Sequence, residues 1–242
     1  MGLIGGMSWV STAMYYEAIN KGVARRLGGL NSAPLLMASH NFAGISERQS
    51  EGDWDGLADV LADSGRRLAD AGAEGLILCS NTAHKVFDRI ADRVGIPMIH
   101  IGDVTAEKLV KDGVKRAGLI GTRYTMSDSF YRDRIEANGI AVATPEPGML
   151  KEIDRIIFEE LVRGHVSRVS QRTLKTCLTI MGQARNQAVI LGCTELVMLV
   201  DPVANVLPVY DTTALHAQAA VEWILGLREA QRIEVAETEA AA

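Results

Sequence analysis

Short apolar runs alternate with amphipathic segments along most of the chain. Leu76 to Leu78 and Val189 to Leu191 are brief, uninterrupted apolar runs, which is typical of buried strands. Between such runs, apolar residues recur three or four positions apart, for example every fourth residue from Tyr15 to Leu27, which is the period of an amphipathic helix. This alternation of strands and helices predicts an α/β fold with parallel sheets.

One sequence pattern occurs twice in the chain. A buried strand leads into a nucleophile-type side chain at Ser80 and again at Cys193, and a Gly-Leu-Ile-Gly sequence opens each half. Its isoleucine, Ile4 or Ile120, comes 76 positions before Ser80 and 73 before Cys193. We expect two similar three-layer αβα domains, each with a parallel sheet, related by a pseudo-twofold axis, with the active site in the cleft between them. The simpler interpretation is two ordinary strand-to-helix junctions.

The predicted domains do not divide the chain into two continuous pieces. The first is expected at 1–100 plus 208–230, because a helix that starts near Asp211 can pack back on the first unit. The second is expected at 101–207. Residues 231–242 are rich in alanine and glutamate without a turn or an apolar stripe, which predicts a disordered tail.

Composition excludes several classes of function. A net charge of −5 with scattered lysine and arginine gives no basic stripe for nucleic acid. No apolar run approaches the ~20 residues of a membrane span, and the N-terminus does not resemble a signal peptide, so a soluble, cytoplasmic protein without a membrane partner is expected. Three cysteines without CxxC and five scattered histidines predict free thiols and no metal site. The glycines after the first strand lack GxGxxG, which argues against nucleotide binding.

The two motifs permit proton transfer at a carbon atom. Side chains on opposite sides of a cleft can remove a proton from one face of a carbon and return one to the other. Cys193 lies at an expected helix N-terminus, where a thiol pKa falls below its usual ~8.5, so we expect thiolate near neutrality. The helix-end N–H groups can hold a carboxylate. No separate cofactor is then required.

Several motifs together resemble the aspartate/glutamate racemase superfamily over almost the whole chain, and within it the L-aspartate/glutamate-specific, broad acidic amino-acid racemases. The resemblance implies a PLP-independent racemase without a cofactor, a two-base reaction at the α-carbon of aspartate or glutamate, a small-molecule amino-acid substrate and a homodimer. The motifs that carry the resemblance are Gly5–Trp9, Leu27–Leu30, Asn81–His84, Gly121–Met126, Ile156–Leu161 and Gly192–Glu195.

The chain departs from the two-thiol members of this superfamily at the first motif. Those members have a cysteine where this chain has Ser80, and aligning the two halves by their strands places Ser80 over Cys193 and Cys79 over Gly192. If the register differs, Cys79 takes the catalytic place of Ser80. Because a hydroxyl hardly ionises near neutrality, we expect Cys193 to remove the proton from an L-amino acid and Ser80 to help return one, so that turnover from L to D is favoured.

The resemblance also implies residues that hold the substrate. Arg48 matches the arginine that aspartate racemases use for a substrate carboxylate, with Gln49 beside it, in a predicted loop over 39–52. Val162 lies where aspartate racemases often have a lysine, and Met7 where glutamate racemases have an aspartate. The remaining candidates are backbone N–H groups and hydroxyl groups that can donate hydrogen bonds to the α-carboxylate of the substrate. They belong to Asn81, Thr82, Thr122, Thr125 and Thr194.

Two other functions compete with racemisation. A decarboxylase of the arylmalonate type needs a single cysteine, which fits the loss of the first thiol; maleate isomerases and hydantoin racemases fit less well because both use two. From a different class, the chain could be a non-catalytic protein that binds an acidic amino acid. The sequence leaves open the preferred amino acid, the favoured direction, the dimer interface and the metabolic role of the product.

Overall fold

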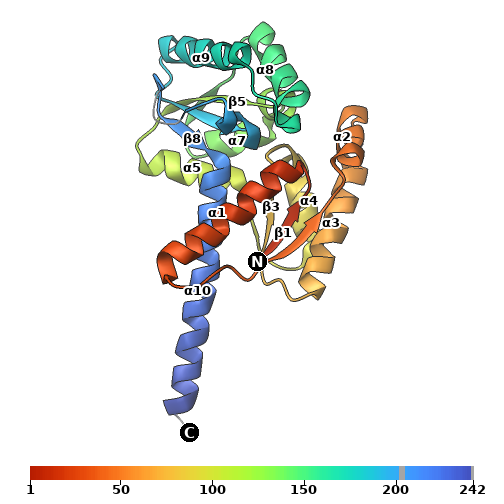
Figure 1. Ribbon diagram of the computed structural model, residues 1–242, viewed down its shortest axis with the longest axis vertical. Coiled ribbons are helices and arrows are strands. Elements are labelled where there is room, and N and C mark those ends of the chain that lie inside the picture. The colour runs from red at the N-terminus through yellow and green to blue at the C-terminus, as the bar shows by residue number, and fades with distance from the viewer. Residues whose placement is uncertain (202–204, 241–242) are drawn as a thin grey trace.

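Two four-stranded parallel sheets, each with helices on both faces, form the two lobes of the protein (Figure 1). The computed structural model describes residues 1–201 and 205–240, with side chains described up to residue 226. No helix in these ranges is both long and apolar enough to cross a membrane.

The lower lobe in Figure 1 holds the first sheet, with strand order β2-β1-β3-β4. Its elements are β1 (Gly2–Gly5), α1 (Trp9–Leu27), β2 (Leu36–Ser39), α2 (Phe42–Glu51), α3 (Trp54–Asp70), β3 (Leu76–Leu78), the 3₁₀ turn η1 (Thr82–Val86), α4 (Phe87–Val94) and β4 (Met98–Ile99).

The upper lobe holds the second sheet, with strand order β6-β5-β7-β8. Its elements are α5 (Ile101–Lys111), β5 (Arg116–Gly121), α6 (Arg123–Ser127), α7 (Ser129–Glu136), β6 (Ala141–Ala143), α8 (Pro147–Glu159), the turn η2 (Leu161–Arg163), α9 (Arg168–Gln183), β7 (Ala188–Gly192), the turn η3 (Thr194–Met198) and β8 (Val209–Asp211). The last helix, α10 (Thr212–Ala240), leaves this lobe and packs beside α1.

The two sheets confirm the predicted α/β fold with two similar units, because their strand orders correspond one to one. Ile4 of β1 lies opposite Leu78 of β3, and Ile120 of β5 lies opposite Leu191 of β7. Two positions beyond these leucines come Ser80 and Cys193. The register therefore makes Ser80 the counterpart of Cys193, as the alignment of the two halves predicted.

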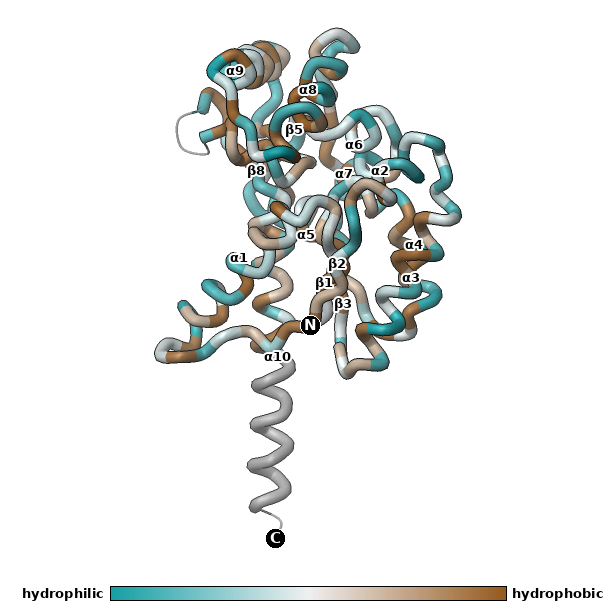
Figure 2. The backbone as a smooth tube through the Cα atoms, turned by 45° about the vertical axis from the view of Figure 1, so that its right-hand side comes forward, coloured by the Kyte–Doolittle hydropathy of each residue, from teal (hydrophilic) through white to brown (hydrophobic). Residues whose placement is uncertain are grey.

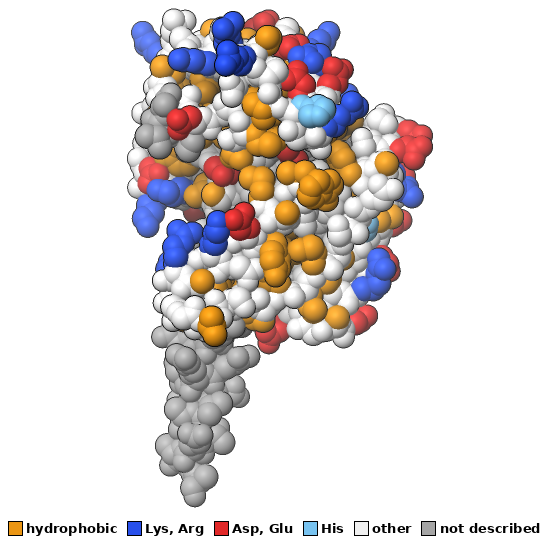
Figure 3. Space-filling view, viewed as in Figure 1, with side chains coloured by type: hydrophobic (Ala, Val, Ile, Leu, Met, Phe, Trp, Pro, Cys, Tyr) orange, Lys and Arg blue, Asp and Glu red, His pale blue; other side chains and the backbone are white. Residues whose placement is uncertain are grey.

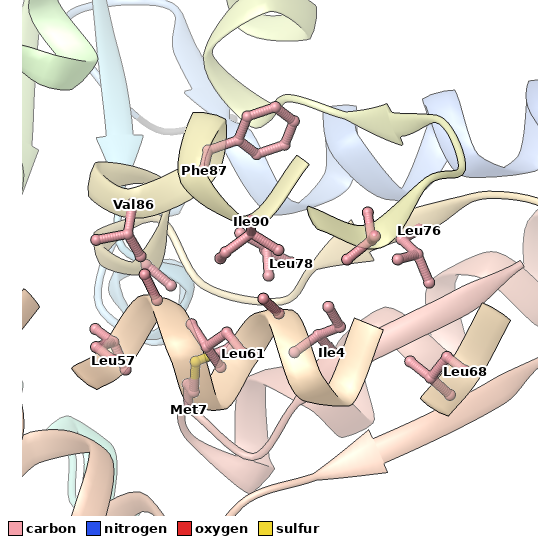
Figure 4. Packing of buried hydrophobic residues seen from close by; sticks show 14 of the residues in the cluster. Ile4, Met7, Leu57, Leu61, Leu68, Leu76, Leu78, Val86, Phe87 and Ile90 are labelled. Atoms are coloured by element: carbon pink, nitrogen blue, oxygen red, sulfur yellow. The ribbon is translucent and has the colours of Figure 1, made fainter. Parts of the chain in front are cut away.

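Apolar clusters fill both faces of each sheet. On one face of the first sheet, side chains of α3 and α4 meet the strands, and Figure 4 shows Leu61, Leu78 and Ile90 packed together there. The hydrophobic segments of α3 and α4 lie side by side in Figure 2. On the opposite face, Tyr15 of α1 and Val221 of α10 pack over the strands. Each large aliphatic side chain buried in this way contributes about 1.5–3 kcal/mol to folding.

The structure differs from the sequence prediction at residues 39–52. We predicted a loop, but Phe42 to Glu51 form α2. The Asn41 side chain accepts a hydrogen bond from the Ala43 N–H and caps the start, and Gly52, with a φ of 74°, ends the helix in the left-handed conformation. Ile45 is the only buried apolar residue of this helix, so the sequence shows no wide apolar stripe there. The caps at its two ends therefore determine where the helix begins and ends.

The return of the chain to the first unit also comes later than predicted. We placed it at residue 208, but Val209 pairs with Val189 of the second sheet, so β8 still belongs to that unit. The return begins with α10 at Thr212. The predicted disordered tail covers residues 231–242. Side chains of 231–240, and residues 241–242 as a whole, lie outside the described structure, so the disorder stays a prediction.

Candidate active site

A cavity lies where strands of both sheets end, between the two lobes. It contains about 410 Å³ of empty space, part of which is open to solvent. Polar residues of the lining follow β3, β5 and β7, and Gln49 adds an amide from α2. Apolar residues come from α2, α8 and η2 and, after β1, from Met7. The lining consists of Met7, Phe42, Gln49, Ser80, Asn81, Thr82, Thr122, Ile157, Phe158, Val162, Gly192, Cys193, Thr194 and Glu195.

Ser80 lines this cavity and Cys79 does not. Successive residues of an extended chain point in opposite directions, and Cys79 accordingly lies in the core between the first sheet and helices α1 and α10. Complete burial raises the pKa of the Cys79 thiol far above its usual value, so it stays neutral. The Ser80 Oγ accepts a hydrogen bond from the Ala83 N–H at 3.3 Å, which leaves the hydroxyl hydrogen free to turn toward the cavity.

A buried histidine holds the backbone of Ser80. The Ile101 N–H donates to Nε2 of His84 at 3.2 Å, so Nδ1 carries the ring hydrogen and donates it to the Ser80 carbonyl at 2.7 Å. Burial lowers the pKa of His84 well below its usual value, which keeps the ring neutral in this tautomer. His84 therefore fixes the end of β3 and does not itself line the cavity.

Cys193 shares its hydrogen with a buried carboxylate. The thiol donates to Oε2 of Glu195 at 3.1 Å, and the Thr194 hydroxyl donates to the same oxygen. The Ser8 hydroxyl, from the first lobe, donates to Oε1 at 2.7 Å. Three donors thus fix the Glu195 carboxylate beside the sulfur, and one of them crosses between the two units.

The predicted lowering of the Cys193 pKa is wrong. Burial raises the pKa of this thiol well above its usual value, and the negative charge of Glu195 raises it further. Backbone N–H groups of Glu195 and Leu196 act in the expected direction, but they belong to η3, a 3₁₀ turn of only five residues, and they are outweighed. Formation of the thiolate therefore requires a nearby group that accepts the thiol proton.

Polar side chains from both lobes also meet across the cavity. Oγ1 of Thr82 and Oγ1 of Thr122 are 2.9 Å apart and share a hydrogen bond. Nδ2 of Asn81 donates to the Thr212 hydroxyl at 3.0 Å, whereas Oδ1 of Asn81 is buried without a hydrogen-bond partner in the described structure. Because buried acceptors are almost always paired, the unpartnered Asn81 Oδ1 has an unused capacity to accept a hydrogen bond.

Two predicted substrate ligands do not line the cavity. Arg48 lies on α2, is partly exposed and pairs with Asp53 just beyond the end of that helix. Thr125 is completely buried, with its hydroxyl 3.2 Å from that of Thr122. The structure does bring together the other candidates, which are Met7, Gln49, Ser80, Asn81, Thr82, Thr122, Cys193 and Thr194.

Sequence reasoning missed part of the apolar lining. Phe42 lies in the segment that was predicted to be a loop, so nothing in the sequence pattern pointed to it. Ile157 and Phe158 lie in α8, where the apolar periodicity predicted burial in a core but not contact with the cavity. The motif Ile156–Leu161 was the one signal that singled out this region. The presence of these side chains makes one side of the cavity apolar.

The chain matches a known protein family over most of its length. The family described as Asp/Glu/Hydantoin racemase matches residues 4–220. The "Broad specificity amino-acid racemase RacX" of Bacillus subtilis is 22% identical, over 93% of this chain and 98% of that protein.

Solved structures agree with this match. A protein of Yersinia pestis, provisionally described as an Asp/Glu racemase, is 43% identical with a TM-score of 0.87, over 93% of this chain and 98% of that one. An aspartate racemase homologue from Pyrococcus horikoshii is 31% identical with a TM-score of 0.79, over 92% of this chain and 97% of that one.

Proposed function

The chain belongs to the Asp/Glu/hydantoin racemase family, and from this premise we propose that it racemises amino acids without a cofactor by moving protons at the α-carbon through Cys193 and Ser80. One observation carries the proposal: these two side chains occupy equivalent ends of the two sheets and line one cavity. The other two cysteines, Cys79 and Cys177, are buried elsewhere.

The contacts of Cys193 supply the first step. Glu195 Oε2 accepts the thiol hydrogen bond, so it is placed to take the thiol proton. The resulting thiolate then removes the α-proton of an L-amino acid and becomes a thiol again. Ser80 gives its hydroxyl proton to the opposite face of the carbanion, and the proton on Glu195 returns to Ser80 through solvent. Protons balance over the cycle.

The zwitterionic part of an amino acid suits the polar side of the cavity. The unpartnered Asn81 Oδ1 is the proposed acceptor for an α-ammonium group. Backbone N–H groups near Thr82 and Thr194, with the Thr122 hydroxyl, are donors for the α-carboxylate. The finer sequence predictions, that aspartate or glutamate is the substrate and that L to D is the faster direction, are part of what the assay below decides.

Exchange of the α-hydrogen with solvent deuterium tests the proposal. We expect the protein to incorporate deuterium into at least one L-amino acid from a panel that includes aspartate and glutamate, and to form the D-enantiomer. Cys193→Ala should abolish exchange, while Cys79→Ala should retain it. Absence of exchange from the whole panel would contradict the proposed reaction, and binding without exchange would indicate the non-catalytic alternative.

Progress curves from each pure enantiomer test the direction. Ser80 is a poor abstracting base, so we expect the maximal rate from L to exceed that from D. The ratio of kcat/KM in the two directions stays at unity, because the equilibrium between enantiomers is fixed. Equal maximal rates would contradict an asymmetric pair.

A single thiol in the cavity also supports a second candidate, the arylmalonate-type decarboxylase, because protonation of one face needs only Cys193. Release of carbon dioxide from an arylmalonate, without deuterium exchange into any amino acid, would favour it over racemisation.

We also propose that the protein is a homodimer, as the family resemblance implies. Trp9 and Tyr16 lie seven positions apart on α1 and are 71% and 52% exposed. Hydrophobic side chains gather over the middle of the face shown in Figure 3. Light scattering should give twice the 26.1 kDa of one chain; the mass of a single chain would contradict this.

A further inference from the structure

We propose that the substrate of this site has an uncharged, largely apolar side chain, so that neither aspartate nor glutamate is the preferred amino acid. The inference rests on the proposed racemase function and concerns the part of the cavity that receives the substrate side chain. Three features carry it: the charge of the lining, the partners of the nearby cations and the origin of the apolar wall.

No lysine or arginine is among the described residues that line the cavity. The charged side chain there is Glu195, an acid. An acidic amino acid brings two carboxylates, and the proposed pose gives the α-carboxylate the donors near Thr82, Thr122 and Thr194. A second carboxylate would be buried without a cation and near the Glu195 carboxylate, which weakens binding.

Two basic residues close to lining residues in the sequence, Arg48 and Lys85, are each paired with an acid. Arg48, the arginine expected to bind a substrate carboxylate, pairs with Asp53. Lys85 donates to Asp128 at 2.7 Å and lies over the ring of Trp54. Each would have to leave an existing partner to reach a substrate.

The wall of the cavity opposite the strand ends is apolar. Ile157 and Phe158 project from the last turn of α8, and Val162 follows on η2. Phe42 and Met7 extend this surface from the first lobe. Gln49 is the polar exception, and its amide carries no charge. An aliphatic or thioether side chain gains burial against such a surface, whereas a carboxylate loses hydration.

The wild-type protein provides the first test. L-methionine and L-glutamate have side chains of similar length and differ in charge, so they form a matched pair. In deuterium exchange we expect kcat/KM for methionine to exceed that for glutamate by at least about tenfold, because the glutamate carboxylate finds no cation. A preference for glutamate or aspartate overturns the inference.

A charge placed in the wall provides the second test. Val162→Lys adds a cation and Val162→Met adds a side chain of similar length without one. We expect Val162→Lys to raise kcat/KM for glutamate relative to methionine by at least about tenfold over Val162→Met. Arg163→Ala removes an exposed cation next in the chain that does not line the cavity, and it should change neither value. Equal ratios in the lysine and methionine variants, or loss of glutamate activity in Arg163→Ala, overturn the inference.

Binding separates failure of the inference from failure of the proposed reaction. If no amino acid exchanges its α-hydrogen, racemisation is excluded, but the rise in Tm caused by L-methionine or by L-glutamate still reports which side chain the cavity accepts. A larger rise with methionine supports the inference without catalysis. A larger rise with glutamate, or no rise with either, overturns it. The Tm of each unliganded variant shows that it is folded.

Discussion

The hydrogen bond from the Cys193 thiol to Glu195 gives the sulfur an immediate acceptor, and it also keeps the thiol protonated at rest. We expect Glu195→Gln to lower kcat by roughly 10²-fold, within the range of general acid–base contributions. Because the charge of Glu195 raises the pKa of Cys193, the same change should lower that pKa and speed alkylation of Cys193 by iodoacetamide at pH 8. Mass spectrometry identifies the modified cysteine.

The combination of slower turnover and faster alkylation distinguishes this role from general damage to the fold. Glu159→Gln is a suitable control, because Glu159 pairs with Arg155 on the exposed side of α8. It should leave both rates unchanged. Slower alkylation in Glu195→Gln would show that the carboxylate does not hold the thiol in its neutral form.

Replacing the hydroxyl by a thiol should make the site symmetric. We expect Ser80→Cys to raise the maximal rate from the D-enantiomer relative to that from the L-enantiomer, because a thiol ionises far more readily than a serine hydroxyl. Cys79→Ala in the same background should not reverse this change, since Cys79 faces the core. Progress curves from each enantiomer measure the ratio; an unchanged ratio would mean that Ser80 does not transfer the second proton.

Among individual residues, the sequence predicted most of the cavity residues at the strand ends, whereas Arg48 and Thr125, also expected to hold the substrate, do not line the cavity. Ser80 and Cys193 follow apolar strands whose register is fixed by burial, so the alternation of side chains determines which residue faces the cavity. Arg48 lies on a polar helix with only one buried apolar residue, and nothing in its own sequence pattern tells whether it points toward the cavity or toward Asp53.

Ser8, at the start of α1, both stabilises this helix and contacts the candidate active site. The Ser8 Oγ accepts from the Ser11 N–H at 3.3 Å as an N-cap and donates to Glu195. Ser8→Ala should lower the free energy of unfolding by about 1 kcal/mol through the lost cap, and it should also lower kcat, because the carboxylate loses a donor from the other lobe.

A second helix cap serves as the matched control. Ser167 caps α9 by accepting from the Ser170 N–H at 3.0 Å, away from the cavity. Ser167→Ala should cost a similar amount of unfolding free energy in urea denaturation and leave kcat unchanged. If both variants lose activity equally, the effect of Ser8 is one of stability alone.

The elements that the sequence missed are those with few apolar contacts. The body of α1 was predicted from the apolar residues that recur every fourth position from Tyr15 to Leu27, since tertiary packing selects an apolar stripe. The helix expected to begin at Cys193 is instead the 3₁₀ turn η3. The choice between a 3₁₀ turn and an α-helix at a strand end depends on local hydrogen bonds, which apolar periodicity does not report.

For the molecule as a whole, three buried neutral histidines predict sensitivity to acid. His84, His100 and His216 are packed together, with ring centroids 4.6 Å apart for His84 and His100 and 5.6 Å for His84 and His216. Burial lowers the pKa of His100 to about 3 and that of His216 to about 4, from 6.5. Below pH 6.5 the unfolded chain binds protons that the folded chain does not.

The free energy of unfolding should therefore fall as the pH drops from 7 to 5, by up to about 1.4 kcal/mol per histidine for each pH unit below 6.5. Urea denaturation at several pH values measures the slope. His100→Asn removes one titrating ring and retains a side-chain acceptor for the Gly102 N–H at the start of α5, so it should flatten the slope. The exposed His165, replaced by Gln, should not alter it.

The architecture was predicted more completely than its boundaries. The 76- and 73-residue spacings within the two halves predicted two equivalent units, and the matching strand orders confirm them. The boundary at 208 was wrong because β8 has only three residues and follows Pro208, so its pairing with β7 left no distinctive pattern in the sequence.

The chain passes between the lobes twice, from β4 into α5 and from β8 into α10, and the His216 ring of α10 donates to the Ile99 carbonyl at the first passage. Because a hydrogen bond joins these two connections, they oppose sliding or twisting of one lobe past the other. The Cys193 sulfur and the Ser80 oxygen thereby keep a single handed arrangement around a bound molecule.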